Sequence, residues 1–274
     1  MTGPVVLVTG CSSGGIGYAL CERFAAEGCR VYATARRLEA MSGLAAHPLI
    51  SLQTLDVTVD EDVHRVIAHI VAEAGQLDII VNNAGFISVG PLIEQPLDNV
   101  KANFDANTYG TLRVAKAGFP HMAARRSGLI VNIGSVVAEI AVPWNGLYSA
   151  SKAAVRAMSD ILHMELKPFN IKVMYVAPVS VRSNISNNEA AKFSLPQGSL
   201  YSDFLPNIIQ RMNSSQANSM PAEKFAREVV RRALKNPPRS VILGGTATIF
   251  KIFGWLPRGF VLWYLWRMYS QKTT

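Results

Sequence analysis

The chain has 274 residues, of which 49% are hydrophobic and 17% are charged, which excludes an intrinsically disordered protein and suits one α/β domain with a large buried core. The net charge of +8 favours anionic partners such as a phosphorylated cofactor, an anionic substrate or a lipid surface, and the alternative is a solvated basic surface. Because no nucleic-acid-binding motif occurs, we expect no nucleic-acid partner.

The first predicted elements are a strand, a glycine-rich turn and a helix. The apolar run 5–8 predicts a buried strand, and residues 18–27 predict a helix that ends at Gly28. Glycines between them let a backbone approach a pyrophosphate, and the helix N-terminus offers free N–H groups, although a simple tight turn is the alternative. The expected cofactor contacts in this turn are Gly10, Ser12, Ser13, Gly15, Ile16 and Gly17.

The cysteines and the N-terminus bear on cell compartment and metal binding. Cys11, Cys21 and Cys29 fit no zinc or redox spacing, so we expect reduced thiols and no metal site. The first strand begins near Pro4, which leaves no room for a signal peptide. We therefore expect a cytoplasmic protein.

The second predicted strand, residues 30–35, ends at Arg36 and Arg37. Dinucleotide-binding folds that select NAD place an acidic residue here for the ribose 2′-hydroxyl, whereas an arginine suits a 2′-phosphate. The first acid is Glu39, so the sequence predicts NADPH/NADP+ with Arg36 as the main contact. The alternative is two solvated arginines.

The third and fourth strands are predicted at residues 49–55 and 77–81, with an amphipathic helix over residues 60–74 between them. We place His64 and His69 on the surface of that helix. Neither belongs to a set of metal ligands.

A possible catalytic group follows the next elements, a long helix over residues 98–124 and a buried strand over residues 129–133. Tyr148 and Lys152 are four residues apart in a helix-favouring stretch, so both side chains point to one face. An ammonium beside a phenol lowers the pKa of the tyrosine toward the range of an acid–base catalyst. Ser135 follows the strand and can reach the same substrate oxygen. The alternative is an ordinary amphipathic helix.

The second half of the chain continues the α/β pattern. Residues 171–176 predict a strand, and Pro221 begins a helix to about residue 234 that precedes the last strand at residues 239–243. Between them, residues 184–220 form a polar segment with scattered large apolar side chains. We interpret this segment as a lid over an apolar substrate, and the alternative is a surface excursion packed on the core.

The tail, residues 244–274, is aromatic and basic. Lys251, Arg258 and Arg267 interrupt its apolar residues and Pro257 breaks any continuous helix, so no apolar run is long enough to span a bilayer. Aromatic and cationic residues together suit a peripheral contact with a membrane, such as the endoplasmic reticulum, or with a lipid droplet. Covering the mouth of a substrate site, or packing on a sister subunit, are the alternatives.

These motifs occur in the order found in the short-chain dehydrogenase/reductase family, which the chain resembles from about residue 5 to residue 183. The resemblance implies a single-domain α/β fold over residues 1–243, with a Rossmann-like, doubly wound parallel sheet and helices on both faces. It implies hydride transfer from NADPH to a ketone or aldehyde of a lipophilic substrate.

The resemblance also assigns roles to individual residues. Tyr148 is the proton donor, Lys152 lowers its pKa and holds the nicotinamide ribose, Ser135 orients the carbonyl, and Asn107 supports a water on a proton relay. Further cofactor contacts implied by the family are Asp56, Val57, Asn83, Ala84, Gly85, Pro178, Val181 and Ser183. Asn82 is expected to be structural, and Val179 departs from the family's glycine. Trp144 and Asn145 are predicted substrate contacts, beside Ser135 and Tyr148.

The identity of the substrate stays open. The runs 9–18, 31–39 and 163–170 look like those of fungal NADPH-dependent 1-acyldihydroxyacetone phosphate reductases, and the first two also resemble 17β-hydroxysteroid dehydrogenases. Lipid metabolism and secondary metabolism are therefore both open. Alcohol oxidation, a non-redox cyclase or isomerase, and an NADPH-binding module are further alternatives. The family resemblance also implies a dimer or tetramer formed through the long helix and the Tyr148 helix.

Overall fold

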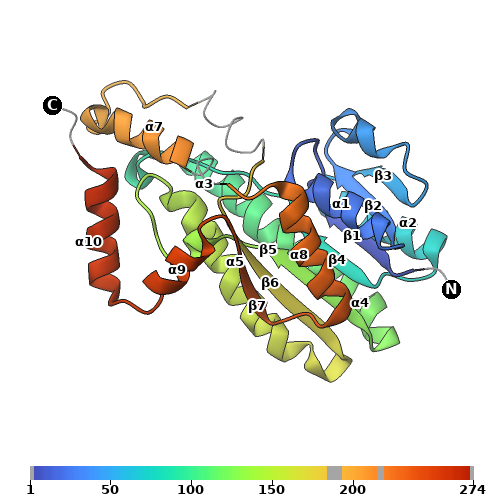
Figure 1. Cartoon of the computed structure of the whole chain (residues 1–274). Coiled ribbons are helices and arrows are strands. Elements are labelled where there is room, and N and C mark those ends of the chain that lie inside the picture. Colours follow the sequence, from blue (N-terminus) through green and yellow to red (C-terminus); the bar gives the residue numbers. More distant parts are fainter. Residues whose placement is uncertain (1–2, 184–192, 215–218, 272–274) are drawn as a thin grey trace.

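The structure, a computed structural model, describes residues 3–183, 193–214 and 219–271 and contains one sheet of seven parallel strands (Figure 1). The strand order is β3-β2-β1-β4-β5-β6-β7. The strands are β1 (Val5–Thr9), β2 (Arg30–Ala35), β3 (Ile50–Thr54), β4 (Ile79–Asn82), β5 (Gly128–Ile133), β6 (Ile171–Val179) and β7 (Ser240–Gly244). This topology confirms the predicted Rossmann-like, doubly wound α/β fold.

Helices cover both faces of the sheet. Helices α1 (Ile16–Ala26) and α8 (Ala222–Lys235) pack together on one face, and α2 (Asp60–Ala74), α4 (Gly110–Arg125) and α5 (Gly146–Glu165) cover the other. Alternate residues of a strand point to opposite faces. In β1, Val6 and Val8 accordingly lie in the core beneath α1, whereas Val5 and Leu7 lie in the core beneath α2 and α4.

The predicted helix over residues 98–124 is divided into three parts. Helix α3 (Leu97–Phe104) is followed by a π-helical turn (Asp105–Tyr109), which leads directly into α4. The amide of Gly110 donates to the carbonyl of Asp105, five residues earlier, so one extra residue is inserted into the helix. Such insertions occur frequently at functional sites, and Asn107 lies within this one.

The strand order reverses at β1, which lies between β2 and β4. In open α/β sheets, ligands bind beyond the carboxyl ends of the strands at such a switch point, because the connecting loops leave in opposite directions there. The fold therefore places the binding site at the ends of β1, β4, β5 and β6.

The C-terminal part of the chain folds back toward this edge of the sheet. Helix α7 (Leu205–Ser214) occupies part of the predicted lid, of which residues 184–192 and 215–218 lie outside the described residues. Ile208 and Met212, one turn apart on α7, pack against Trp144, which explains why a segment predicted as a loop forms a helix.

The tail forms two helices, α9 (Ala247–Phe253) and α10 (Arg258–Tyr269), which Pro257 separates as predicted. Helix α10 lies against α7 (Figure 1). The indole of Trp144 donates to the Tyr269 carbonyl at 2.8 Å, and the Asn207 amide donates to the Gln271 carbonyl at 2.9 Å. The tail therefore packs on the mouth of the site, one of the arrangements left open by the sequence, while its Trp255 side chain stays exposed.

Candidate active site

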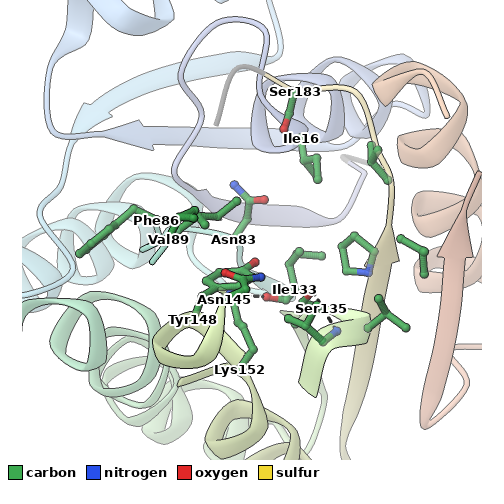
Figure 2. A pocket seen from close by; sticks show the side chains of 18 of the residues that line it. Ile16, Asn83, Phe86, Val89, Ile133, Ser135, Asn145, Tyr148, Lys152 and Ser183 are labelled. Atoms are coloured by element: carbon green, nitrogen blue, oxygen red, sulfur yellow. Dashed lines mark hydrogen bonds between the residues drawn. The ribbon is translucent and has the colours of Figure 1, made fainter. Parts of the chain in front are cut away.

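A cavity of about 1000 Å³ opens at the carboxyl ends of the strands (Figure 2). Its wall brings together residues from distant parts of the chain, including most of those predicted from sequence. The predicted residues on the wall are Gly10, Ser12, Ser13, Gly15, Ile16, Arg36, Asp56, Val57, Asn83, Ala84, Gly85, Ser135, Trp144, Asn145, Tyr148, Lys152, Pro178, Val181 and Ser183. Gly17 and Asn107 are absent from the described wall.

The glycine-rich turn lies against the loop after β4. Gly10 has a positive φ of 73°, and a Cβ atom there would lie 2.7 Å from the Ala84 Cα, so only glycine fits. Gly17 is buried behind the turn, where a Cβ would lie 2.5 Å from the Gly10 carbonyl oxygen. Gly17 therefore shapes the turn without lining the cavity, and Gly15, the N-cap of α1, does line it.

The cavity's outer end is polar and basic. Ser12, Ser13 and Arg36 are exposed there, beside the N-terminus of α1. Free N–H groups and the helix dipole favour a phosphate at such a place, and a guanidinium adds bidentate donors. A dinucleotide carrying a 2′-phosphate fits this set of residues.

Two asparagines after β4 fix the architecture of the cavity. The Asn82 amide donates to the side-chain oxygen of Asn132 at 2.9 Å, which joins β4 to β5 and makes Asn82 structural, as expected. The Asn83 amide donates to the carbonyls of Thr9 and Gly10, both at 2.9 Å. Asn83 therefore lines the cavity and also holds the glycine-rich turn in place.

Tyr148 and Lys152 occupy successive turns of α5 on the face toward the cavity (Figure 2). Lys152 is only 4% exposed, and its Nζ atom donates to the Ile133 carbonyl at 2.9 Å. Burial lowers the pKa of Lys152 to about 8, because a charged ammonium loses its hydration there. The lysine is thus positioned to exchange a proton near neutral pH.

The pKa of Tyr148 shifts in the direction opposite to the lowering expected from Lys152. Burial raises the pKa of Tyr148 to about 12, while the Ser135 side chain and the Arg211 guanidinium act in the opposite direction. The Lys152 Nζ lies 5.8 Å from the centre of the Tyr148 ring and bonds elsewhere, so loss of hydration outweighs its attraction for a phenolate. The phenol remains protonated at neutral pH, as a proton donor must be.

Asn107 lies behind the cavity wall, in the π-helical turn. Its amide nitrogen donates to the Phe86 carbonyl at 2.9 Å and to the Ser151 hydroxyl at 3.0 Å, and its oxygen accepts from the Phe86 amide. A Cβ atom on Gly85 would lie 2.7 Å from this oxygen and 3.6 Å from the Lys152 Nζ. Asn107 is therefore near the buried ammonium, although its side chain is held by protein groups.

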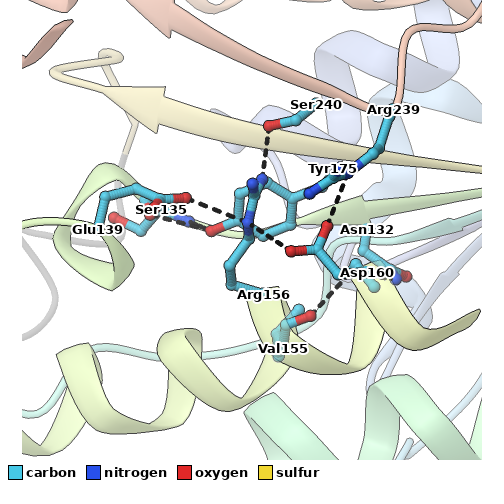
Figure 3. Close-up of polar contacts among 10 residues, drawn as sticks. Asn132, Ser135, Glu139, Val155, Arg156, Asp160, Tyr175, Arg239 and Ser240 are labelled. Atoms are coloured by element: carbon cyan, nitrogen blue, oxygen red, sulfur yellow. Dashed lines mark hydrogen bonds and ion pairs between the residues drawn. The ribbon is translucent and has the colours of Figure 1, made fainter. Parts of the chain in front are cut away.

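Tyr175, which belongs to no motif in the sequence, holds Ser135 in place. The Tyr175 hydroxyl on β6 accepts from the Ser135 amide at 3.2 Å and donates to the Ser135 carbonyl at 3.1 Å (Figure 3). The Arg156 guanidinium stacks on the Tyr175 ring at 4.8 Å and forms ion pairs with Glu139 and Asp160. The only available signal was a single tyrosine within the aliphatic strand of residues 171–179.

The wall near β6 carries the departure from the family pattern. Val179 is buried at the end of β6 and packs against Val136, Val137 and the tail residue Val261. It pairs with Gly244 of β7, where any Cβ atom would lie 1.6 Å from the Val179 carbonyl oxygen. The valine is accommodated because the tail supplies an apolar partner for it.

The inner half of the cavity is largely apolar. Trp144, the predicted substrate contact, makes ring contacts with Phe204 at 5.6 Å and with Trp266 of α10 at 5.9 Å. Asn145 occupies the N-cap position of α5, without a capping hydrogen bond from its side chain, and lines the wall. The remaining apolar wall on this side comes from the tail: Ile249, Phe250, Phe253, Tyr264, Leu265, Met268 and Tyr269.

Arg211 is a second residue that the sequence did not identify. It lies on α7, lines the same cavity, and places its guanidinium 5.8 Å from the centre of the Tyr269 ring. No sequence motif surrounds it, so only the folded position reveals it.

Sequence comparisons find a matching family model and relatives that span most of the chain. Residues 4–193 match the model of the short chain dehydrogenase family. A short-chain dehydrogenase of Penicillium ochrochloron is 39% identical over 82% of this chain and 82% of its own length. An NADPH-dependent 1-acyldihydroxyacetone phosphate reductase of Schizosaccharomyces pombe is 38% identical over 80% of this chain and 73% of its own length.

Solved structures extend the similarity through the C-terminal part. A short-chain dehydrogenase from Streptomyces avermitilis superposes with a TM-score of 0.80 at 32% identity, covering 98% of both chains. A short-chain dehydrogenase from Burkholderia cenocepacia, in complex with NADP, superposes with a TM-score of 0.75 at 25% identity, again over 98% of both chains.

Within the described residues, no helix has the length and apolar character needed to cross a membrane.

Proposed function

This chain belongs to the short-chain dehydrogenase family, and we propose that it is an NADPH-dependent reductase of a ketone or aldehyde on a lipophilic substrate. One observation carries the proposal: a single cavity joins Ser135, Tyr148 and Lys152 to an apolar inner half and to a basic outer end. The catalytic group alone would fit several reactions. The surrounding cavity favours a greasy carbonyl compound.

The cofactor is NADPH/NADP+. The fission-yeast relative is NADPH-dependent, and the Burkholderia structure holds NADP. In this chain, Arg36 with Ser12 and Ser13 would hold the 2′-phosphate, the N-terminus of α1 the pyrophosphate, and Lys152 the nicotinamide ribose. When bound, NADPH supplies the hydride for the carbonyl carbon.

The chain's own residues then act on the substrate oxygen. Tyr148 donates the proton, because its raised pKa keeps the phenol protonated. Ser135 orients the carbonyl and stabilises the negative charge that develops on its oxygen. Lys152 relays a proton to the tyrosine, since its pKa of about 8 permits exchange near neutral pH, and Asn107 supports the relay behind it.

The substitution Tyr148→Phe tests this assignment. We expect NADPH binding to be retained, whereas turnover falls by about 100-fold or more because the proton donor is lost. Tyr264→Phe is the matched control, since it removes a hydroxyl from another tyrosine on the same wall. NADPH oxidation is measured with a panel of apolar ketones, and substantial ketone reduction by Tyr148→Phe would refute the assigned role.

Two readings of the biological role remain within this proposal. The relatives include a 1-acyldihydroxyacetone phosphate reductase and a short-chain dehydrogenase of Penicillium ochrochloron. A phosphorylated acyl ketone and a neutral ketone of secondary metabolism are both candidate substrates. A non-redox cyclase or isomerase, or a binding module, would consume no NADPH with any ketone. The same panel of substrates therefore separates these classes.

We also propose a homo-oligomer, a dimer or tetramer, formed through α4 and α5. Large apolar side chains are exposed along these helices, namely Leu112, Ile161 and Met164. Their burial against a second copy removes apolar surface from water. Light scattering of the wild type and of Ile161→Glu tests this, and a monomeric wild-type protein would refute it.

We treat the tail, from residue 244 onward, as a separate segment. We propose that it contacts a lipid surface, either at the cytoplasmic side of the endoplasmic reticulum or on a lipid droplet. Its outer face exposes Trp255, at 91%, together with Phe260 and Trp263, and the tail contains no acidic residue. Aromatic and basic side chains together favour an anionic interface. Cosedimentation with anionic vesicles should require Trp255, and equal binding by Trp255→Ser would refute the contact.

A further inference from the structure

We propose that Arg211 binds an anionic group of the substrate, so that the preferred substrate is an amphiphile bearing a carboxylate or phosphate near its carbonyl. The inference rests on the proposed reductase function and narrows the substrate class. It concerns a residue outside the family's motifs and outside the predicted sites.

The position of Arg211 places a cation where the substrate must lie. Helix α7 is anchored by Ile208 and Met212, which pack against Trp144, and Arg211 on the same helix lines the cavity with Tyr148 and Ser135. The guanidinium lies close enough to the Tyr148 phenol to lower its pKa. Because Arg211 and Tyr148 line one cavity, a group held by Arg211 would belong to the same molecule as the carbonyl that Tyr148 protonates.

The distribution of charge around the cavity favours an anion at this point. On the part of the wall that the structure describes, the cations are Arg36, Lys152 and Arg211. Arg36 is assigned to the proposed cofactor phosphate and Lys152 to the catalytic group, whereas Arg211 lies on α7, next to Met212, which packs against the predicted substrate contact Trp144. The acidic residues on the same wall are Asp56, which follows β3, and Asp105, which pairs with Arg113 at 3.1 Å.

The surroundings of Arg211 make an anionic ligand energetically favourable. Aromatic and aliphatic side chains from α9 and α10 form the adjacent wall, and Arg211 faces the Tyr269 ring. Burial lowers the pKa of Arg211, which means that its charge has lost hydration. In such a poorly hydrated place a carboxylate or phosphate forms a strong charged hydrogen bond, and a guanidinium has five N–H donors, enough for a ligand as well as for its protein contacts.

The apolar wall explains the rest of the proposed substrate. Phe250, Phe253 and Leu265 line the same cavity as Arg211, so an acyl or other hydrocarbon chain would be buried against them. A soluble keto acid without such a chain would leave this surface uncovered. The structure thus assigns the head group to α7 and the hydrocarbon part to the tail.

Ligand binding tests the inference independently of catalysis. The protein saturated with NADP+ is titrated calorimetrically with decyl phosphate, decanoate and decanol. We expect at least one of the two anions to bind about tenfold or more tightly than decanol in the wild type, and Arg211→Gln to remove this preference. The phosphate and carboxylate arms identify the anion. Equal affinity of the wild type for all three compounds would overturn the inference, whether or not Arg211→Gln folds.

A matched variant and a kinetic readout separate this inference from its alternatives. Arg267→Gln removes an exposed cation of α10 that lies over Trp263 rather than on the cavity wall, so it should leave the anion preference unchanged. For an anionic ketone, Arg211→Gln should raise KM about tenfold, with less than about threefold change for its neutral methyl ester. Equal losses for acid and ester, together with a shifted pH profile, would overturn the anion site and indicate that Arg211 only tunes Tyr148.

The two proposals fail in different ways. A wild-type protein that binds decyl phosphate or decanoate selectively but oxidises NADPH with no ketone would refute the reductase function and keep the anion site. A protein that reduces neutral ketones and shows no preference for an anion would do the reverse.

Discussion

Replacing Lys152 with methionine should stabilise the folded protein at neutral pH. Burial lowers the pKa of this lysine from its ordinary value of 10.5 to about 8. Below pH 8 the ammonium is charged in both the folded and the unfolded chain, so the folded state bears the full cost of burying it. The gap between the two pKa values corresponds to about 3 kcal/mol.

The net gain is smaller, because the lysine also makes a useful contact. Its Nζ donates to the Ile133 carbonyl at 2.9 Å, and losing that bond leaves a buried acceptor unpaired at a cost of about 1–2 kcal/mol. Methionine fills a similar volume and adapts to the space. We therefore expect Lys152→Met to raise the free energy of unfolding by about 1–2 kcal/mol at pH 7.

The stability gained by Lys152→Met should depend on pH. Between pH 8 and pH 10.5 the unfolded chain binds more protons at Lys152 than the folded protein does, so the stability of the wild type rises with pH in that window. The advantage of Lys152→Met should accordingly disappear near pH 10. Buried tyrosines titrate at still higher pH, but they are common to both proteins and cancel in the difference.

Urea unfolding without cofactor, followed by tryptophan fluorescence at pH 7 and pH 10, measures this difference. Lys101→Met is the control, because Lys101 is exposed and its removal should change the unfolding free energy by less than about 0.5 kcal/mol. A Lys152→Met protein that is less stable than the wild type at pH 7, or an advantage that does not vary with pH, would refute the reasoning.

Three further predictions concern the site. Arg36→Ala should weaken NADPH binding about tenfold or more and leave NADH binding nearly unchanged, as cofactor titration would show; equal losses would contradict the 2′-phosphate contact. Tyr175→Phe removes the hydroxyl bonds to Ser135 and should lower kcat with little change in KM for NADPH, and an unchanged kcat would argue against that positioning role. The kcat/KM for ketone reduction should fall as pH rises through about 8, because Lys152 loses its proton there while Tyr148, with a pKa of about 12, keeps its own. A profile that stays flat to pH 10 would exclude Lys152 from the proton relay.

The elements that the sequence predicts well are those with a local physical signature. A buried parallel strand reads as an apolar run, and Asp60–Ala74 shows a helical stripe with the bounds that were predicted for it. The glycine-rich turn is specified by close backbone approach, as at Gly10. Spacing alone also placed Tyr148 and Lys152 on one helical face, since four residues make about one turn.

The features that escaped prediction depend on contacts between distant segments. The π-helical turn around Asn107 has no compositional signal, and the pKa of Tyr148 follows from burial, which a sequence does not state. The sequence predicts a loop where α7 forms, because the packing partner of this helix, Trp144, lies about sixty residues earlier in the chain. The sequence places Tyr175 only in a strand, because its partner, Ser135, lies in the loop that follows the neighbouring strand β5.

The residues proposed for the chemistry are positioned largely by local structure, whereas those proposed to select the substrate are positioned by contacts between distant segments. Tyr148 and Lys152 are fixed by α5 and the sheet, whereas Arg211 and the apolar wall depend on α7 and the tail. The two parts meet through Trp144, which packs against α7 and bonds to the Tyr269 carbonyl, and through an apolar cluster in which Tyr148 and Val179 pack with Val261 and Leu265 of α10. A change at Arg211 on α7 can therefore alter the head group that is accepted while α5 still holds the proton donor. It follows that similarity in the catalytic half is weak evidence about the substrate, and that the charge at position 211 discriminates between the candidate substrates more directly than the motifs do.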